Sequence, residues 1–198
     1  MMNKEKEIRQ LHIENIETRT EENGSMMIEG YVATFNSKSK YMGFYEVIDP
    51  RAFNTTLEDK HNIFMLYNHD WDKPLGDTDT GTLSLEVDNI GLRFSLKLDN
   101  SISYAKDVYN LVNKNLIKGR SFGFYVNEDN WGMNENMEDI RTLLSITLLE
   151  CTLTPIPAYN DTSASCRSYQ DHINELEKHK QNELRKIELE LIELELDL

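Results

Sequence analysis

The stretch that decides the fold runs from Thr82 to Asp99 and reads TLSLEVDNIGLRFSLKLD. Apolar residues occupy every second position on both sides of a central Asp88-Asn89-Ile90-Gly91 sequence. An extended strand places alternate side chains on opposite faces, so this pattern predicts two strands that each bury one face. Asp, Asn and Gly accept the backbone angles of tight turns, so the centre predicts a hairpin turn and the whole segment predicts antiparallel sheet.

Segments on both sides of this hairpin predict further strands and two helices. Strand-like patterns cover residues 7–19, 26–35, 63–67, 121–126 and 143–153, with a turn at Asn23-Gly24 between the first two and an acidic loop over 127–139 between the last two. Asp49-Pro50 is typical of a helix start, and Phe53 and Leu57 then lie four residues apart. Residues 101–118 have helical spacing and end at Gly119. The fold class is therefore mainly β with helices, or α+β.

The composition of the chain changes near Tyr169. Leu and Ile then recur at spacings of three and four among Glu and Lys, which predicts an amphipathic helix. We expect one domain over residues 1–168 and an acidic C-terminal helix over 169–198. Such a helix is long enough to self-associate or to bind a partner, and a solvated or docked helix is the alternative. Lys180 occupies a position where a coiled-coil seam requires an apolar residue.

Composition excludes several function classes. The 198 residues carry a net charge of -14, which disfavours binding to nucleic acid. No run of 18 apolar residues predicts a membrane helix, and the first residues lack an apolar signal core, so we expect a cytoplasmic protein. Cys151 and Cys166 lack metal-ligand spacing, and we interpret both as ordinary small residues. We expect no metal and no other cofactor.

Three polar residues in otherwise apolar or tightly turned segments form a candidate catalytic set. His69 follows the apolar strand 63–67, Ser121 lies between Gly119 and Gly123, and Glu150 interrupts the apolar run that begins at residue 143. A serine hydroxyl becomes nucleophilic only when a base such as imidazole takes its proton. A carboxylate buried in a strand needs a partner, and an imidazole N–H provides one.

Each of these residues also has a structural interpretation, which the sequence leaves open. His69 could cap a loop, and Glu150 could lie at a solvated sheet edge. Asp70 is an alternative acid, although adjacent strand residues point to opposite faces. Gly119 to Gly123 also matches the Gly-X-Ser-X-Gly string of α/β-hydrolases, but that fold requires a strand before the serine and a helix after it, which is the reverse of the predicted order. A small-ester hydrolase is therefore not favoured.

The amino-acid sequences of these segments, and their order along the chain, resemble those of the prohead, or capsid maturation, proteases of tailed bacteriophages. The resemblance spans about residues 7–168 and rests on EGYVATFN (29–36), YEVIDP (45–50), Ala52-Phe53, LYNHD (66–70), Leu75-Gly76, Gly81-Thr82-Leu83, Gly91-Leu92, SFGF (121–124), Arg141 and LECTLTPIPAY (149–159). Each piece is weak by itself, and the common order carries the resemblance.

This resemblance implies a serine endopeptidase with a compact antiparallel β-barrel flanked by helices, similar to the herpesvirus assemblins. It implies that His69 is the general base and Ser121 the nucleophile, with Glu150 as the third member and Asp70 as the alternative. Arg141, Gly123 and backbone N–H groups are candidates for oxyanion stabilisation or support, and Arg141 could equally be structural.

The resemblance also implies the biological setting of the reaction. The implied partners are the major capsid protein with its scaffolding segment and the protease itself, inside a procapsid in the host cytoplasm. A free phage and a prophage are equally compatible origins. The alternative function is a non-catalytic capsid-assembly or scaffolding module with a protease-like fold.

Overall fold

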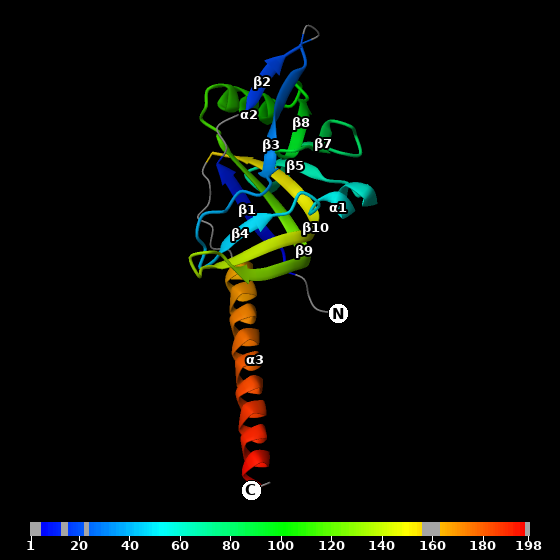
Figure 1. The fold of residues 1–198 in the computed structure, drawn as a ribbon. Coiled ribbons are helices and arrows are strands. Elements are labelled where there is room, and N and C mark those ends of the chain that lie inside the picture. The colour runs from blue at the N-terminus through cyan, green and yellow to red at the C-terminus, as the bar shows by residue number, and fades with distance from the viewer. Residues whose placement is uncertain (1–4, 13–15, 22–23, 156–162, 197–198) are drawn as a thin grey trace.

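The computed structural model describes residues 5–12, 16–21, 24–155 and 163–196 (Figure 1). Asn23 of the predicted turn and the side chain of Cys166 lie outside the described part of the chain. The elements in chain order are β1 (Glu7–His12), β2 (Glu17–Thr20), β3 (Met26–Thr34), β4 (Tyr45–Ile48), α1 (Asn54–Asp59), β5 (Phe64–Tyr67), β6 (Asp70–Asp77), β7 (Leu83–Val87), β8 (Gly91–Leu98), α2 (Ser103–Asn113), β9 (Gly119–Met133), β10 (Asp139–Thr154) and α3 (Ser163–Leu196).

The alternating segment forms the predicted hairpin of β7 and β8. It belongs to a four-stranded sheet in the order β2-β3-β8-β7. The Asp88 carboxylate closes the turn by accepting hydrogen bonds from the amides of Ile90 and Gly91, at 2.7 and 3.0 Å. A Cβ atom on Gly91 would lie 1.9 Å from the carbonyl oxygen of Ala33, so β8 can approach β3 this closely only with glycine there.

A second sheet carries the candidate site residues. Its order is β1-β9-β10-β5-β6, and β4 pairs in parallel with the first half of β10. The predicted loop over 127–139 is wrong, because β9 continues to Met133 and β10 starts at Asp139. The residues of this stretch are mostly polar, and their side chains are largely exposed. Trp131 of β9 packs against Phe44, which lies in the loop before β4, and the two ring centres are 4.9 Å apart. Burial by a distant segment thus holds a polar sequence in a strand.

The predicted compact antiparallel β-barrel is wrong. The described strands form two open sheets, and the second contains two parallel pairs, β10 with β4 and β10 with β5. A barrel forms when the first and last strands of one sheet pair with each other. Here β1 and β6 are separate edges of one sheet, and β2 and β7 are separate edges of the other. The broader α+β prediction is confirmed.

One continuous core lies between the two sheets and beneath the short helices. Ile28, Leu92 and Leu96 of one sheet and Phe122 and Leu148 of the other are fully or almost fully buried in it. Burying each such side chain contributes about 1.5–3 kcal/mol to folding. This core holds β9 and β10, which carry Ser121 and Glu150, and β5, which leads into the turn with His69, in fixed positions.

Both internal helices are shorter than predicted. α1 starts at Asn54, because the residues from Pro50 to Phe53 form a turn in which the Asp49 carboxylate accepts a hydrogen bond from the amide of Arg51. α2 ends at Asn113, and Asn115 beyond it has a positive φ of 57°. Residues 119 and 120 then already belong to β9, so Gly119 starts a strand in addition to following a helix.

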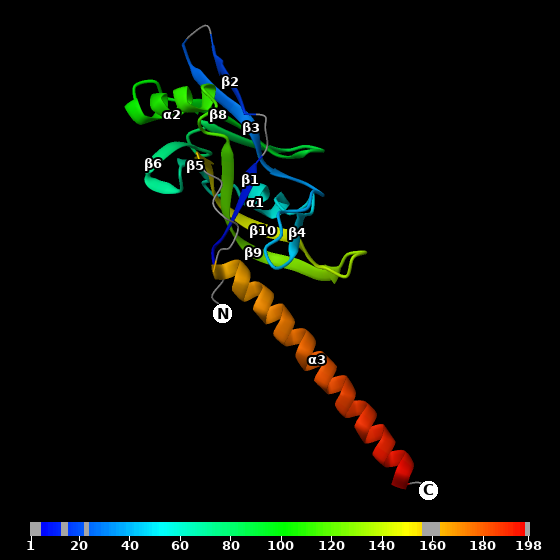
Figure 2. The same ribbon diagram turned by 90° about the vertical axis from the view of Figure 1, so that its left-hand side faces the viewer.

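The C-terminal helix α3 projects away from the sheets (Figures 1 and 2). The predicted domain limit at residues 168 and 169 lies inside this helix. Its first turns pack on the β9–β10 hairpin, where the His172 ring stacks on Trp131 at 4.3 Å and the Tyr169 hydroxyl donates a hydrogen bond to Asp139 at 2.8 Å. Burial and that hydrogen bond raise the pKa of Tyr169 to about 12. No described helix is both long and apolar enough to cross a membrane.

Candidate active site

His69 lies in the tight turn between β5 and β6. Asn68 and His69 both have positive φ angles, 54° and 58°, which are uncommon for residues with a Cβ atom. Two hydrogen bonds to β10 hold this strained turn. The His69 amide donates to Thr152 Oγ1 at 2.8 Å, and the Asn68 amide donates to the carbonyl of Leu153 at 2.9 Å. The turn therefore places the His69 ring against β10.

The His69 ring contacts Glu150, which is fully buried on β10. The distance from His69 Nδ1 to Glu150 Oε1 is 2.8 Å. An ionised carboxylate only accepts hydrogen bonds, so Nδ1 carries the proton and Nε2 becomes the acceptor of the neutral ring. Nε2 is buried and has no hydrogen-bond partner among the described residues. The imidazole therefore has the tautomer of a general base, with an unoccupied acceptor nitrogen.

Ser121 lies on the same face of the sheet as Glu150. In the antiparallel pair of β9 and β10, Ser121 is opposite Thr152 and Gly123 is opposite Glu150. Residues directly opposite each other, and residues two apart on one strand, share a face. Ser121 is fully buried, and its hydroxyl donates to the carbonyl oxygen of Arg9 at 2.8 Å instead of to His69. The structure thus brings His69 and Glu150 into contact and leaves the Ser121 hydroxyl on a neighbouring strand.

Gly123 provides the space in which the Glu150 carboxylate lies. A Cβ atom at this position would be 2.5 Å from Glu150 Oε1 and 2.3 Å from Lys6 Cε. These distances are shorter than any ordinary contact between side chains, so an alanine would displace one or both groups. Gly123 was expected to support the site, and the structure shows how it can do so: the absence of a side chain there leaves room for the Glu150 carboxylate.

The alternative acid, Asp70, has different partners. Its carboxylate accepts a hydrogen bond from the Asp72 amide at 3.0 Å and pairs with Lys73 at 3.1 Å. The Asp72 amide and then Lys73 lower the pKa of Asp70. These contacts stabilise the start of β6 and occupy Asp70 there, whereas Glu150 contacts the His69 ring.

Arg141 belongs to a buried ion network at the other end of β10. It pairs with Glu7 at 3.0 Å, Glu46 at 3.4 Å and Asp129 at 2.6 Å. Arg9 joins the network through Glu46, to which its Nη2 donates at 2.7 Å. Burial alone would raise the pKa of Glu7, but Arg9 and Arg141 outweigh burial and the pKa of Glu7 is lowered. The contacts of Arg141 are those of a residue that joins strands.

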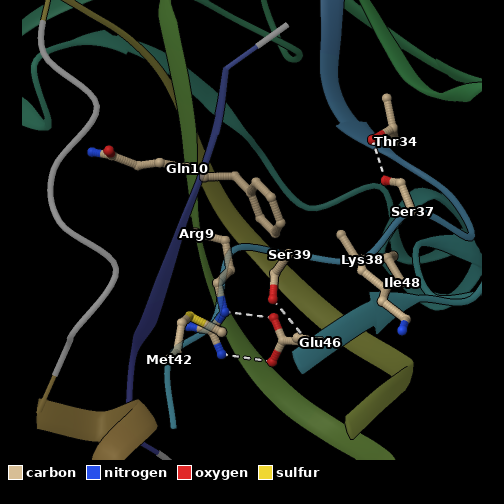
Figure 3. Close-up of a pocket in the computed structure, with 10 residues that line it drawn as sticks. Arg9, Gln10, Thr34, Ser37, Lys38, Ser39, Met42, Glu46 and Ile48 are labelled. Carbon is tan, nitrogen blue, oxygen red and sulfur yellow. Dashed lines mark hydrogen bonds and ion pairs between the residues drawn. The ribbon is translucent and has the colours of Figure 1, made fainter. Parts of the chain in front are cut away.

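A small pocket borders this network, and Figure 3 shows the pair of hydrogen bonds between Arg9 and Glu46 at its edge. Its lining includes Ser39, Met42 and Phe122. Phe122 follows Ser121 on β9, so its side chain lies on the opposite face of the sheet. His69, Ser121 and Glu150 do not line this pocket. The pocket is therefore separate from the candidate catalytic face.

Comparison with known proteins identifies the family. A sequence profile of the family described as caudovirus prohead serine protease matches residues 14–181, which is most of the chain. The chain belongs to the caudovirus prohead serine protease family. The resemblance predicted from the ordered motifs is thus confirmed, and the prohead protease family is one of serine peptidases. A search of curated proteins finds no match.

A search of solved structures gives a further similarity. It is to the capsid assembly protease gp21 of bacteriophage T4, with a TM-score of 0.48 and 10% sequence identity. The match covers 75% of this chain and 98% of the T4 chain.

Sequence reasoning missed three charged residues near the start of the chain, of which Lys6 contacts the candidate site and Glu7 and Arg9 belong to the ion network of Arg141. Lys6 contacts Glu150 Oε1 at 3.1 Å, and Glu7 and Arg9 are buried, although the charged run at residues 4–7 suggests a solvated end. The alternation of Lys6, Ile8 and Gln10 against Glu7 and Arg9 was the available signal, because it fits a strand with two differently charged faces. Only the pairing of β1 with β9 shows that these residues form a strand with two distinct faces.

Proposed function

We propose that this protein is a serine endopeptidase of phage capsid maturation in which Ser121 is the nucleophile, His69 the general base and Glu150 the residue that orients His69. The observation that carries the proposal is the 2.8 Å contact between His69 Nδ1 and Glu150 Oε1, which leaves Nε2 unpartnered on the face where Ser121 lies. Family membership supports the same reaction class.

The reaction is acyl transfer from a peptide to the enzyme and then to water. Ser121 Oγ leaves the Arg9 carbonyl by rotating about its Cα–Cβ bond and gives its proton to His69 Nε2 as it attacks the scissile carbonyl carbon. His69 then protonates the leaving amine as the C–N bond breaks. The same imidazole takes a proton from the water that attacks the ester carbonyl, and it returns this proton to Ser121 Oγ as the bond between Oγ and the acyl carbon breaks and the carboxylic acid is released.

Glu150 supports each step without exchanging a proton. Its buried charge stabilises the imidazolium that forms when His69 accepts the Ser121 proton, and the hydrogen bond keeps the ring in one tautomer. Gly123 is assigned the support role described above. Arg141 is assigned a structural role, because its donors contact the carboxylates of Glu7, Glu46 and Asp129.

The proposed substrates are polypeptides of the assembling capsid. They are the scaffolding segment of the major capsid protein and this chain itself, cleaved inside the procapsid in the host cytoplasm, and α3 offers an exposed segment for self-association or for removal. No cofactor takes part in the proposed reaction.

The test is the intact mass of the purified chain over time, alone and with capsid protein. Wild type is expected to release fragments that begin or end within residues 160–198, or to shorten the capsid protein, and Ser121→Ala is expected to do neither. Ser84→Ala is the matched control, because Ser84 is an exposed strand serine on β7. A fluorophosphonate probe should add its mass to wild type and to Ser84→Ala, but not to Ser121→Ala.

The second candidate function is a non-catalytic scaffolding module that binds capsid protein. The observation in its favour is that Ser121 is fully buried and bonded to a backbone carbonyl. Binding of capsid protein by wild type without cleavage, together with no probe labelling, would establish this function in place of the protease.

A further inference from the structure

We infer that Lys6 is a positioning residue of the proposed protease, and that it holds the Glu150 carboxylate in place and limits the negative charge that His69 experiences. This inference rests on the proposed function of His69 and Glu150. It adds a third group to the pair, from a segment of the chain that lies 144 residues before Glu150 in sequence.

The first observation is that Lys6 and His69 share one oxygen atom. Glu150 Oε1 lies 3.1 Å from Lys6 Nζ and 2.8 Å from His69 Nδ1. The other carboxylate oxygen, Oε2, is buried without a hydrogen-bond partner among the described residues. A carboxylate removed from water is costly unless a cation pairs with it. Neutral His69 offers a hydrogen bond but no charge, so the cation beside Glu150 is Lys6.

The second observation is that the Lys6 side chain packs against Gly123 and Trp71. Its Cε lies where a side chain at Gly123 would be, and its ammonium group lies 5.8 Å from the centre of the Trp71 ring. Trp71 is itself held by an edge-on contact with Phe64, at 5.7 Å between ring centres. The Lys6 side chain is about one-third exposed, so its charge remains partly solvated while the stem packs on the sheet.

The electrostatic consequence follows from this geometry. Because both nitrogens contact Oε1, Lys6 Nζ and His69 Nδ1 lie within about 6 Å of each other. A positive charge at that distance disfavours the imidazolium form of His69. Lys6 therefore favours the neutral imidazole that a general base requires, and it fixes the carboxylate that orients the ring.

Other ionisable groups near the pair do not replace Lys6. Asp70 on β6 pairs with Lys73. Cys151 follows Glu150 on β10 and faces the core, where burial and then Glu150 raise the pKa of its thiol. Ser121 on β9 donates to the Arg9 carbonyl. A change in the titration of His69 on removal of Lys6 can therefore be attributed to the loss of that charge.

The experiment is a pH titration of the His69 ring by NMR of 15N-histidine-labelled protein, which does not require peptide cleavage. The variants are Lys6→Gln, Lys6→Arg and the control Lys38→Gln, since Lys38 also lies over an aromatic ring, 5.2 Å from the centre of Tyr45. Removal of a positive charge at this distance should move the measured midpoint of the His69 titration to higher pH in Lys6→Gln than in wild type. Lys6→Arg and Lys38→Gln should leave it unchanged. His69→Gln identifies the signals.

A midpoint that stays the same or falls in Lys6→Gln overturns the inference. The acid limb of the cleavage rate should move upward by the same amount, so that Lys6→Gln recovers activity at higher pH. If wild type neither cleaves nor reacts with the fluorophosphonate probe, the proposed function fails, while the NMR titration still decides whether Lys6 acts on His69.

Discussion

The contact of Glu150 and Lys6 across Gly123 makes Gly123→Ala the sharpest test of the site. An added Cβ would lie 2.3 Å from Lys6 Cε and 2.5 Å from Glu150 Oε1. Carbon atoms in contact prefer separations of about 3.5–4.0 Å. The flexible Lys6 side chain can turn into solvent, but the fully buried Glu150 has to shift by about 1 Å within a packed sheet.

Two quantities follow from this displacement. Overpacking of a buried site typically lowers the free energy of unfolding by about 1–3 kcal/mol. A displacement of about 1 Å in a catalytic group lowers rates by about 100-fold, so peptide cleavage should fall by about that factor. Gly132→Ala is the matched control, because Gly132 lies on the same strand, its φ is ordinary and no atom lies within 4 Å of its added Cβ. That variant should be unchanged or more stable by about 0.4–1 kcal/mol.

The assay is urea unfolding of both variants followed by circular dichroism, together with the cleavage rate of capsid protein at one pH. Equal unfolding free energies and equal cleavage rates for the two variants would refute the reasoning that Gly123 provides the space for Glu150. A loss of cleavage without a loss of stability would show that Glu150 moves at little cost.

Four further predictions concern ionisable residues of the site and its surroundings. Glu150→Gln should lower the cleavage rate by at least about 100-fold, whereas Asp70→Asn should lower it less than about twofold. Equal losses in the two variants would contradict the assignment of Glu150 as the acid that orients His69. Arg141→Met should lower the free energy of unfolding in urea by about 3–5 kcal/mol, because it leaves buried carboxylates short of a partner, and a loss below about 1 kcal/mol would count against the network. The pKa of Glu7 in the folded chain lies below its ordinary value of 4.5. Its ionised carboxylate therefore stabilises the fold above that pH, and this stabilisation is lost as the pH falls through the folded value. The free energy of unfolding in urea, measured from about pH 3 to about pH 7, should depend less on pH in Glu7→Gln than in wild type. The pKa of Tyr169 is raised to about 12, so ultraviolet titration of wild type should show a late phenolate signal that is missing in Tyr169→Phe.

The sequence by itself determined the local elements whose patterns are strong. The alternation from residue 82 to 99 is sufficient for β7 and β8, because a period of two with a turn in the middle fits only a half-buried hairpin. The ordered motifs were also sufficient to identify the family. His69, Ser121 and Glu150 were selected because each is a polar residue in a segment whose neighbours indicate burial or a tight turn.

Only the tertiary structure decided how those elements assemble. The polar segments that became β6 and the middle of the β9–β10 hairpin have no apolar alternation, and they are strands because neighbouring strands supply their hydrogen bonds. Two open sheets formed in place of a barrel because strand pairing depends on contacts between distant residues, which local periodicity does not encode. For the same reason, the contact of Lys6 with Glu150 and the pairing of Arg141 with Glu7 become visible only when β1, β9 and β10 lie side by side.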